Sequence, residues 1–330
     1  MMCDSSRPLV SVLIPVYKTE RFIGRCIASI IKQDYRPLQV VLVDDCGGDN
    51  AMNIACEMLT DVEGITLTKV FHDKNCGVTT ARRHSLEHAE GDYLLFLDSD
   101  DYWDAPGNVS HIIQEMLSDP DLDVVVTDYF ADYPKRIKYM RVDCPSTSQA
   151  TAKCLLQGHM PSFLWNKCFK KDSFLKYAGK FVDGVKLWED FMVLVPFFAN
   201  PIKLKYIHYS FVHYEQGNEN SLIHTMDAGT LEKIIEAIRY CEQMIPNRAI
   251  YEEDIKCAYI SAKAHVMQNV PLKDYSSILE VYKELDCYNM KRVAPLYSKV
   301  IFALQRKKST RYLGFILNEL ILRWKYILRH

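Results

Sequence analysis

The sequence predicts an α/β fold, in which a mostly parallel sheet is flanked by helices and followed by an all-helical C-terminal region. Over the first 127 residues, short apolar runs alternate with segments of helical periodicity. Strands that are apolar on both faces and alternate with helices are typical of parallel sheets covered on both sides. From Asp227 onward the pattern is helical only, and aspartate occurs at or just after the ends of three of the first four predicted strands.

Each element of this first part follows from its own residues. Runs rich in β-branched residues indicate strands at 8–17, 38–45, 65–71, 92–98 and 122–129. Between them, apolar residues recur at helical spacing, as at Phe22, Ile23, Cys26, Ile27 and Ile30. We therefore expect helices at 20–34, 47–59 and 78–89, and a fourth from Pro106 to Asp119. Residues 128–226 are less regular and are expected to add a short strand, helices and an edge hairpin.

Composition places the chain among ordinary globular proteins. Of its 330 residues, 48% are apolar and 25% charged, so we expect a large core and little disorder. A net charge of −2 argues against a general nucleic-acid binder. The eleven cysteines are scattered without a CxxC pair, which indicates reduced, buried thiols in a cytosolic protein. We expect neither a signal peptide nor an ordinary transmembrane helix.

Carboxylates cluster after the fourth predicted strand, in the stretch LLFLDSDDYWD at residues 94–104. The carboxyl ends of parallel strands meet at one edge of a sheet, where ligands bind. Asp98 and Asp100 should therefore lie near the acids that follow the other strands, and Ser99 permits the turn between them. Two oxygen donors on one loop suit Mg²⁺ or Mn²⁺, which could neutralise a diphosphate leaving group. The alternative is a set of solvated loop acids, one of which caps the next helix.

Four blocks carry a family resemblance: VSVLIPVYKTERFIGRCIASIIKQDY, VVLVDDCGGDN, NCGVTTARRHSLEHAEGDYLLFLDSDD and WEDFMVL. In their order and spacing they resemble the successive blocks of family 2 inverting glycosyltransferases, from residue 9 to about residue 225. The resemblance implies the GT-A fold, a nucleotide-sugar donor, and Mg²⁺ or Mn²⁺ as cofactor.

The same resemblance implies a donor site. Asp100 would be the principal metal ligand, and Asp98 would face the ribose or the metal. Asp45 would accept a hydrogen bond from the base, and Arg82 would brace the diphosphate or the two metal-binding acids. The implied donor-binding residues are Pro15, Val16, Tyr17, Glu20, Asp45, Asn75, Gly77, Ala81, Arg82, Asp98, Ser99 and Asp100. Arg83 stands where the family usually has asparagine.

The catalytic base is implied by the WED block. Asp190 would take a proton from the acceptor hydroxyl, and Glu189 would orient Asp190 or contact the acceptor. Taken alone, these acids could simply face the dipole at a helix N-terminus. Trp165, Lys167 and Trp188 are expected to bind the acceptor, with core packing as the alternative for both tryptophans.

The last 32 residues are basic, with eight Lys or Arg and one acid, Glu319. Apolar residues of this tail fall on one helical face: Leu313, Ile316, Leu317, Leu320, Ile321, Trp324, Ile327 and Leu328. This composition is typical of a helix that lies in a membrane interface. A core-packing helix with a solvated basic side is the alternative.

We therefore expect a metal-dependent inverting glycosyltransferase. It would move a sugar from a nucleotide-sugar, with UDP-sugar as the expected donor, to a hydroxyl of a glycan or lipid-linked oligosaccharide in cell-surface polysaccharide synthesis. Residues 1–127 would form the nucleotide-sugar-binding half, 128–226 the acceptor-binding half, and 227–330 the helical region with the tail. A cytoplasmic location, peripheral at the inner face of the membrane, would suit this role.

Two other functions fit parts of the sequence. A non-catalytic nucleotide-sugar-binding or scaffold protein of a glycan assembly complex would share the fold, but it would not need both acidic motifs. A sugar-nucleotidyltransferase would need a glycine-rich basic segment after the first strand, which PVYKTERFIG lacks. The sequence leaves open the donor sugar, the acceptor and linkage, the choice of Mg²⁺ or Mn²⁺, and the oligomeric state.

Overall fold

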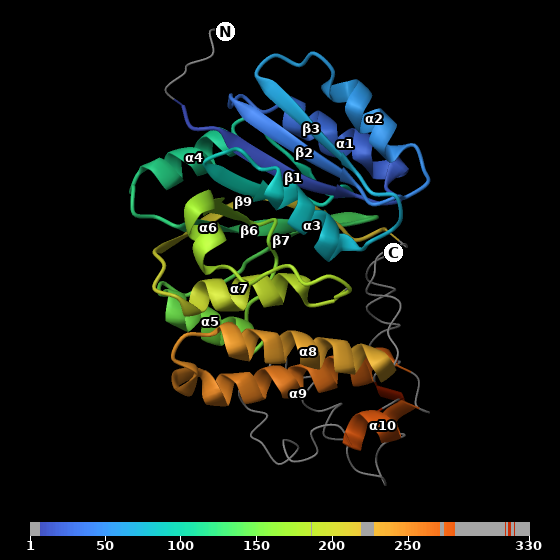
Figure 1. Cartoon of the computed structure of the whole chain (residues 1–330), viewed down its shortest axis with the longest axis vertical. Coiled ribbons are helices and arrows are strands. Elements are labelled where there is room, and N and C mark those ends of the chain that lie inside the picture. The colour runs from blue at the N-terminus through green and yellow to red at the C-terminus, as the bar shows by residue number, and fades with distance from the viewer. Residues whose placement is uncertain are drawn as a thin grey trace.

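The chain folds around one mixed sheet, which we describe from a computed structural model. The structure describes residues 7–185, 187–218, 228–270 and 274–280, together with residues 314, 316, 317 and 320. Within this part the strands lie in the order β3-β2-β1-β4-β8-β6-β9-β5, and β7 pairs with β6. Figure 1 shows the sheet in the upper half of the molecule and a stack of helices below it.

The first half of the sheet is parallel, as its buried apolar runs predict. It contains β1 (Val10–Val16), β2 (Leu38–Asp44), β3 (Ile65–Phe71) and β4 (Tyr93–Phe96). In register, Val12 of β1 lies between Val40 of β2 and Leu95 of β4. β1 pairs with β2 as far as Val16, but its pairing with β4 ends at Leu13. The strand order also reverses here, since β2 lies on one side of β1 and β4 on the other, and such a switch point is where ligands bind in open α/β sheets.

Three helices cover this half of the sheet. α1 (Glu20–Ile31) and α2 (Ala51–Leu59) pack together, and α3 (Val78–Glu87) contacts β1 and β2. Figure 1 shows α3 in front of the strands and α1 and α2 behind them. α1 buries Ile23, Cys26, Ile27 and Ile30, which is the apolar stripe that its periodicity predicts.

The second half of the sheet mixes strand directions. β6 (Val124–Tyr133) runs parallel to β9 (Leu204–Glu215) and antiparallel to β7 (Arg136–Met140) and β8 (Lys167–Lys170). β8 also pairs antiparallel with β4, and β5 (Tyr102–Trp103) pairs antiparallel with β9. α4 (Asn108–Leu117) packs on β6. Strands β1–β4, β6 and β9 thus run in one direction, so the expected mostly parallel sheet is confirmed.

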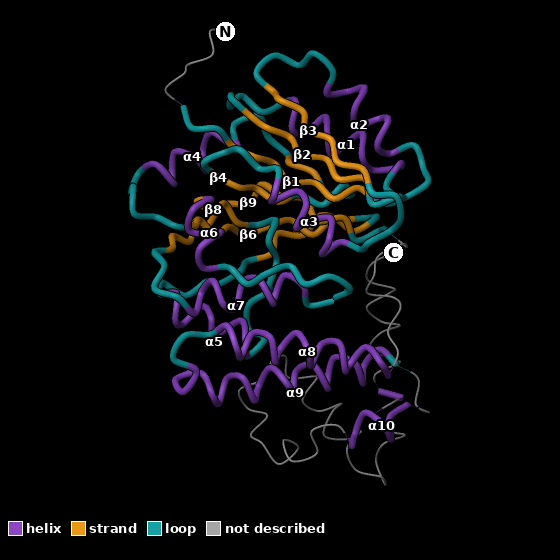
Figure 2. The backbone as a smooth tube through the Cα atoms, viewed as in Figure 1, coloured by secondary structure: helices purple, strands orange, loops and turns teal. Residues whose placement is uncertain are grey.

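The remaining helices form a layered block beside the sheet. These helices are α5 (Ser148–Leu156), α6 (Lys171–Tyr177), α7 (Glu189–Ala199), α8 (Ala228–Met244), α9 (Glu252–Asn269) and α10 (Tyr275–Glu280), with the 3₁₀ turn η2 (Arg248–Tyr251). Both α7 and α9 pack on α5 and on α8. Figure 2 shows this block as a purple region below the orange strands. The helical region expected after Asp227 is therefore present in the described residues.

Of the expected domain boundaries and the basic tail, only the first boundary lies wholly within the described residues. The expected boundary at residue 127 lies inside β6, and the boundary at 226 lies outside the described residues. The basic tail also lies outside them, apart from residues 314, 316, 317 and 320. Among the described helices, none has the length and apolar character needed to cross a bilayer.

Candidate active site

A cavity of about 520 Å³ opens at the carboxyl ends of β1, β2 and β4. Its walls come from the loops after these strands, from α3, from the N-terminus of α7 and from the segment before β8. Of the residues expected in the site, all but Val16, Glu20 and Lys167 line this cavity. Asp100 and Asp190, which are 90 residues apart in sequence, therefore face one space.

Arg82 ties together the acids that the sequence places in separate motifs. It is buried on α3, and one of its terminal nitrogens, Nη2, lies 2.8 Å from Asp98 Oδ1. The other, Nη1, lies 3.0 Å from Glu189 Oε1 and 2.5 Å from Asp190 Oδ1. Burial alone would lower the pKa of Arg82, but the three carboxylates together raise it, so the guanidinium stays charged. Arg82 thus holds the expected metal-binding acid and the expected base in one cluster.

Asp190 combines burial with a fixed orientation. Its Oδ2 accepts a hydrogen bond from the Leu164 N–H at 3.0 Å, while Oδ1 faces Arg82. Burial raises the pKa of Asp190 to about 7; Arg82 opposes this shift, and the negative charges of Glu189 and Asp98 add to it. Trp188, directly before this pair, has φ 64°, a left-handed conformation that is strained for a bulky residue and is found at functional sites.

The loop after β4 turns sharply between Asp98 and Asp101. The Asp101 N–H donates to the Asp98 carbonyl at 3.0 Å, and Thr19 donates to Ser99 Oγ at 3.0 Å. Asn218 donates to Asp100 Oδ2 at 2.8 Å. Burial raises the pKa of Asp100 to about 6, and the negative charge of Asp98 adds to the shift. A nearby dication would relieve this repulsion, so the oxygen donors and the charge of the pair fit Mg²⁺ or Mn²⁺.

Asp101 differs from its neighbours in being completely buried. Its Oδ1 accepts from the Glu215 N–H at 2.8 Å, which ties this loop to the end of β9. Its Oδ2 has no hydrogen-bond partner among the described residues. Burial, together with Asp100 and Asp98, raises the pKa of Asp101 well above its usual range. A protonated Asp101 in a structural role is consistent with this environment.

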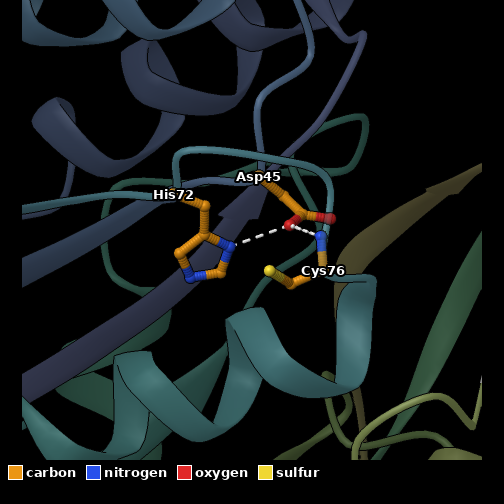
Figure 3. Close-up of side chains that lie close together, drawn as sticks. All are labelled: Asp45, His72 and Cys76. Carbon is orange, nitrogen blue, oxygen red and sulfur yellow. Dashed lines mark hydrogen bonds and ion pairs between the residues drawn. The ribbon is translucent and has the colours of Figure 1, made fainter.

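Directly after β2, Asp45 is held by three donors from the loop after β3. His72 Nδ1 lies 2.8 Å from Asp45 Oδ1, the Cys76 N–H donates to Oδ1 at 2.7 Å, and the Gly77 N–H donates to Oδ2 at 2.9 Å. Figure 3 shows the side chains of Asp45, His72 and Cys76 pointing toward one another. Gly77 has φ 90°, where a side chain would be strained.

The same three side chains could hold a metal ion, because one ligand atom of each lies within 4.8 Å of the other two. However, the 2.8 Å separation of His72 from Asp45 is that of a hydrogen bond, and Asp45 already accepts two backbone N–H groups. Hydrogen bonding accounts for this cluster as it stands.

Three expected contacts differ from the structure. Val16 is 1% exposed and packs in the core at the last position of β1. Glu20 accepts from the Asn50 N–H at 3.1 Å and lines a smaller cavity of about 270 Å³, which shares Asn218 with the first. Lys167 is 0% exposed, and its ammonium donates to the Phe163 carbonyl and to Asn166 Oδ1. Lys167 therefore braces the segment before β8 and does not reach the cavity.

The aromatic residues of that braced segment form one wall of the cavity. Trp165 stacks on Phe163 with ring centroids 4.5 Å apart and contacts Tyr214 at 5.2 Å. Trp165 is buried and Trp188 is half-buried, and both line the cavity. Trp165 thus packs in the core, as its alternative role predicts, and also borders the cavity.

Sequence reasoning missed several residues of the wall. Phe163 and Tyr214 lie in aromatic runs that could have indicated them, but His265 carries no local signal. His265 comes from α9, and burial lowers its pKa. The helical C-terminal region therefore contributes directly to the cavity.

Comparison with known proteins identifies the class and then the family. The fold is the GT-A arrangement, as in the crystal structure of Staphylococcus aureus TarS 1–349 in complex with UDP-GlcNAc. That structure matches with a TM-score of 0.62 and 15% identity over 96% of this chain and 92% of the other. A mannosyltransferase from Pyrobaculum calidifontis, in complex with GDP-Man and Mn²⁺, matches with a TM-score of 0.51 and 14% identity over 97% and 88%.

The family model for glycosyl transferase family 2 matches residues 11–178. The chain belongs to this family. It is 30% identical over 169 residues to the putative glycosyltransferase EpsH of Bacillus subtilis (strain 168), a match that covers 50% of this chain and 47% of the relative. The chain thus spans about half the length of this relative.

Proposed function

We propose that this glycosyltransferase moves a sugar from a UDP-sugar to a hydroxyl of a glycan or lipid-linked oligosaccharide, with inversion at the anomeric carbon. The observation that carries the proposal is the Arg82 cluster, which joins Asp98, Glu189 and Asp190 on the wall of one cavity. A non-catalytic binding protein would have no need to bury an ionisable base beside the metal-binding acids. This cluster therefore favours an enzyme over a scaffold.

In this proposal each group has one task. Asp45, Tyr17 and Pro15 bind the nucleoside, and Asp98 and Asp100 would hold Mg²⁺ or Mn²⁺. The bound dication would offset negative charge on the leaving diphosphate. Asp190 removes the proton of the acceptor hydroxyl while that oxygen forms its bond to the anomeric carbon. The bond from this carbon to the diphosphate oxygen breaks on the opposite face, and the configuration inverts.

The acceptor side is assigned from its chemistry. The half-buried ring of Trp188 suits a sugar ring, because a sugar presents apolar C–H groups beside its hydroxyls, and the buried Trp165 supports this wall. The Leu164 N–H donates to Asp190 and so holds this wall next to it. We propose that a glycan end lies between this wall and the diphosphate.

A thermal-shift experiment tests the donor. UDP with Mn²⁺ at 100 times its Kd should stabilise the protein by about 2.7 kcal/mol. Asp100→Asn should remove most of the Mn²⁺-dependent part of that shift, because the pair loses one negative ligand. Asp121→Asn, at an acid that is 84% exposed, should behave like the wild type. If no nucleoside diphosphate shifts the melting temperature, the donor assignment is wrong.

The pKa of Asp190 predicts how turnover depends on pH. The base works in its ionised form, and its pKa is raised to about 7. Activity should therefore be present above this pH and lost as pH falls through it. Below pH 7, kcat/KM is expected to fall about tenfold per pH unit. Initial rates of transfer across neutral pH measure the profile. A flat profile through pH 7 would show that Asp190 is not the base.

A further inference from the structure

Two imidazoles form a hydrogen-bonded chain behind Asp45. His72, which directly follows β3, places Nδ1 2.8 Å from Asp45 Oδ1. Its other ring nitrogen, Nε2, lies 2.7 Å from Nδ1 of His84 on α3. The two rings meet edge to face at 86°, with centroids 4.9 Å apart. Three separate segments thus meet in one chain that ends at a residue of the cavity wall.

The hydrogen-bond partners of His72 and His84 determine which of their ring nitrogens carry protons. A carboxylate only accepts hydrogen bonds, so His72 Nδ1 must carry a hydrogen. In a neutral His72, Nε2 then accepts, and His84 Nδ1 must donate. Burial lowers the pKa of His84, and Arg83 and His72 lower it further, while Glu87 and Asp183 oppose this. With both rings neutral, the tautomer of each is set by its hydrogen-bond neighbour.

The hydrogen bond from His72 helps to hold the Asp45 carboxylate in its orientation. The Cys76 and Gly77 N–H groups come from the backbone of one turn, and His72 is the side-chain donor to Asp45 in the described structure. The side chains of His72 and Asp45 are only 5% and 4% exposed. In such a buried site a hydrogen bond to a charged group is stronger than at the surface. Losing it would free the carboxylate to rotate away from the cavity.

We propose that His72, held by His84, is a positioning residue that sets the choice of nucleobase in the donor. It fixes Asp45 as an acceptor for a ring N–H of the base. Uracil presents such an N–H at its pairing edge, whereas cytosine presents a bare nitrogen there. This inference rests on the proposed function, since it assumes that Asp45 meets the base of a nucleotide-sugar.

Variants at His72 test the inference by titration calorimetry with UDP and CDP in the presence of Mn²⁺. The wild type should prefer UDP. His72→Leu should weaken UDP binding about tenfold, the usual scale for losing a hydrogen bond to a charged group. CDP binding should change much less, so discrimination between the two nucleotides should shrink. At saturating donor, kcat should stay within about twofold, because the contact acts on binding and not on the reacting atoms.

Two further variants separate positioning from a general loss of structure. His72→Asn keeps an amide nitrogen near the position of Nδ1 and should recover most of the UDP preference. His72→Gln carries its amide nitrogen farther out, near the position of Nε2, and should not. His84→Phe removes the second link and should weaken UDP binding by less than His72→Leu does. Melting temperatures show which variants remain folded.

The outcomes are distinct. A folded His72→Leu that binds UDP as the wild type does overturns the inference. So does an equal loss of UDP and CDP, or a His72→Asn no better than His72→Gln. In each of these cases the wild type still binds UDP, so the proposed function stands. A wild type that binds no nucleoside diphosphate overturns the proposed function and this inference with it.

Discussion

Asp190→Asn should lower kcat for sugar transfer by about 10²–10⁴-fold, the usual contribution of a positioned general base. An amide cannot take the proton of the acceptor hydroxyl, although it has nearly the same shape as the carboxylate. Binding of UDP and Mn²⁺ should survive, because Asp98 and Asp100 belong to a different loop. Single-turnover rates and UDP titrations on the same preparation measure the two effects separately.

The controls for this variant concern its fold. An amide at residue 190 cannot accept from both Arg82 and Leu164, so its melting temperature must be measured beside its activity. Asp121→Asn, which makes the same chemical change at an exposed acid, should retain full turnover. A folded Asp190→Asn with wild-type kcat would remove Asp190 from the mechanism. Equal losses of UDP binding and turnover would assign it to the donor site instead.

Arg82→Met should destabilise the protein by about 3–5 kcal/mol at neutral pH, because it leaves buried carboxylates without their partner. The affected groups are Asp98, Glu189 and Asp190. Protonation can relieve part of this repulsion, so the loss of stability should be smaller at acidic pH and larger at alkaline pH. Denaturant unfolding at several pH values measures the effect. Transfer activity should fall as well, because Asp190 loses the positive charge that favours its ionised form.

Arg83 provides the matched control. It is the next residue on α3, but its side chain is 34% exposed and pairs with Glu87 and Asp183 at the surface. Arg83→Met should therefore cost about 0–1 kcal/mol, as for other surface ion pairs. If the two variants unfold at the same denaturant concentration, Arg82 is not the centre of the cluster. Comparable loss at acidic and alkaline pH would contradict the role of carboxylate repulsion.

Local sequence patterns were sufficient for the first half of the fold. The expected strands at 38–45 and 65–71 correspond to β2 and β3, and the expected helix at 78–89 corresponds to α3. Each of these elements has a single hydrophobic periodicity and packs against elements that are close in the sequence. Local sequence patterns are therefore enough to define them. β8 shows the limit: four residues long, it inserts antiparallel between β4 and β6. Its partners lie far away in sequence, and no local periodicity encodes them.

The site residues also divide into those that local sequence predicts and those that depend on distant segments. Asp45 and Asp98 could be expected at one edge because parallel strands end there, and both line the cavity. Lys167 could not be placed, since whether an ammonium faces a ligand or a carbonyl depends on the fold around it. The Phe163 carbonyl and Asn166 satisfy it inside the protein.

The sequence by itself determined the family, the order of strands and helices in the first half, and the chemical kinds of group at the strand ends. These properties depend on residue type and on spacing along the chain. The tertiary structure alone decided that one arginine joins Asp98 to Asp190, that His72 stands behind Asp45, and that α9 brings His265 to the cavity. Such contacts join segments through space, and their energies depend on burial and on partners that no single stretch of sequence contains.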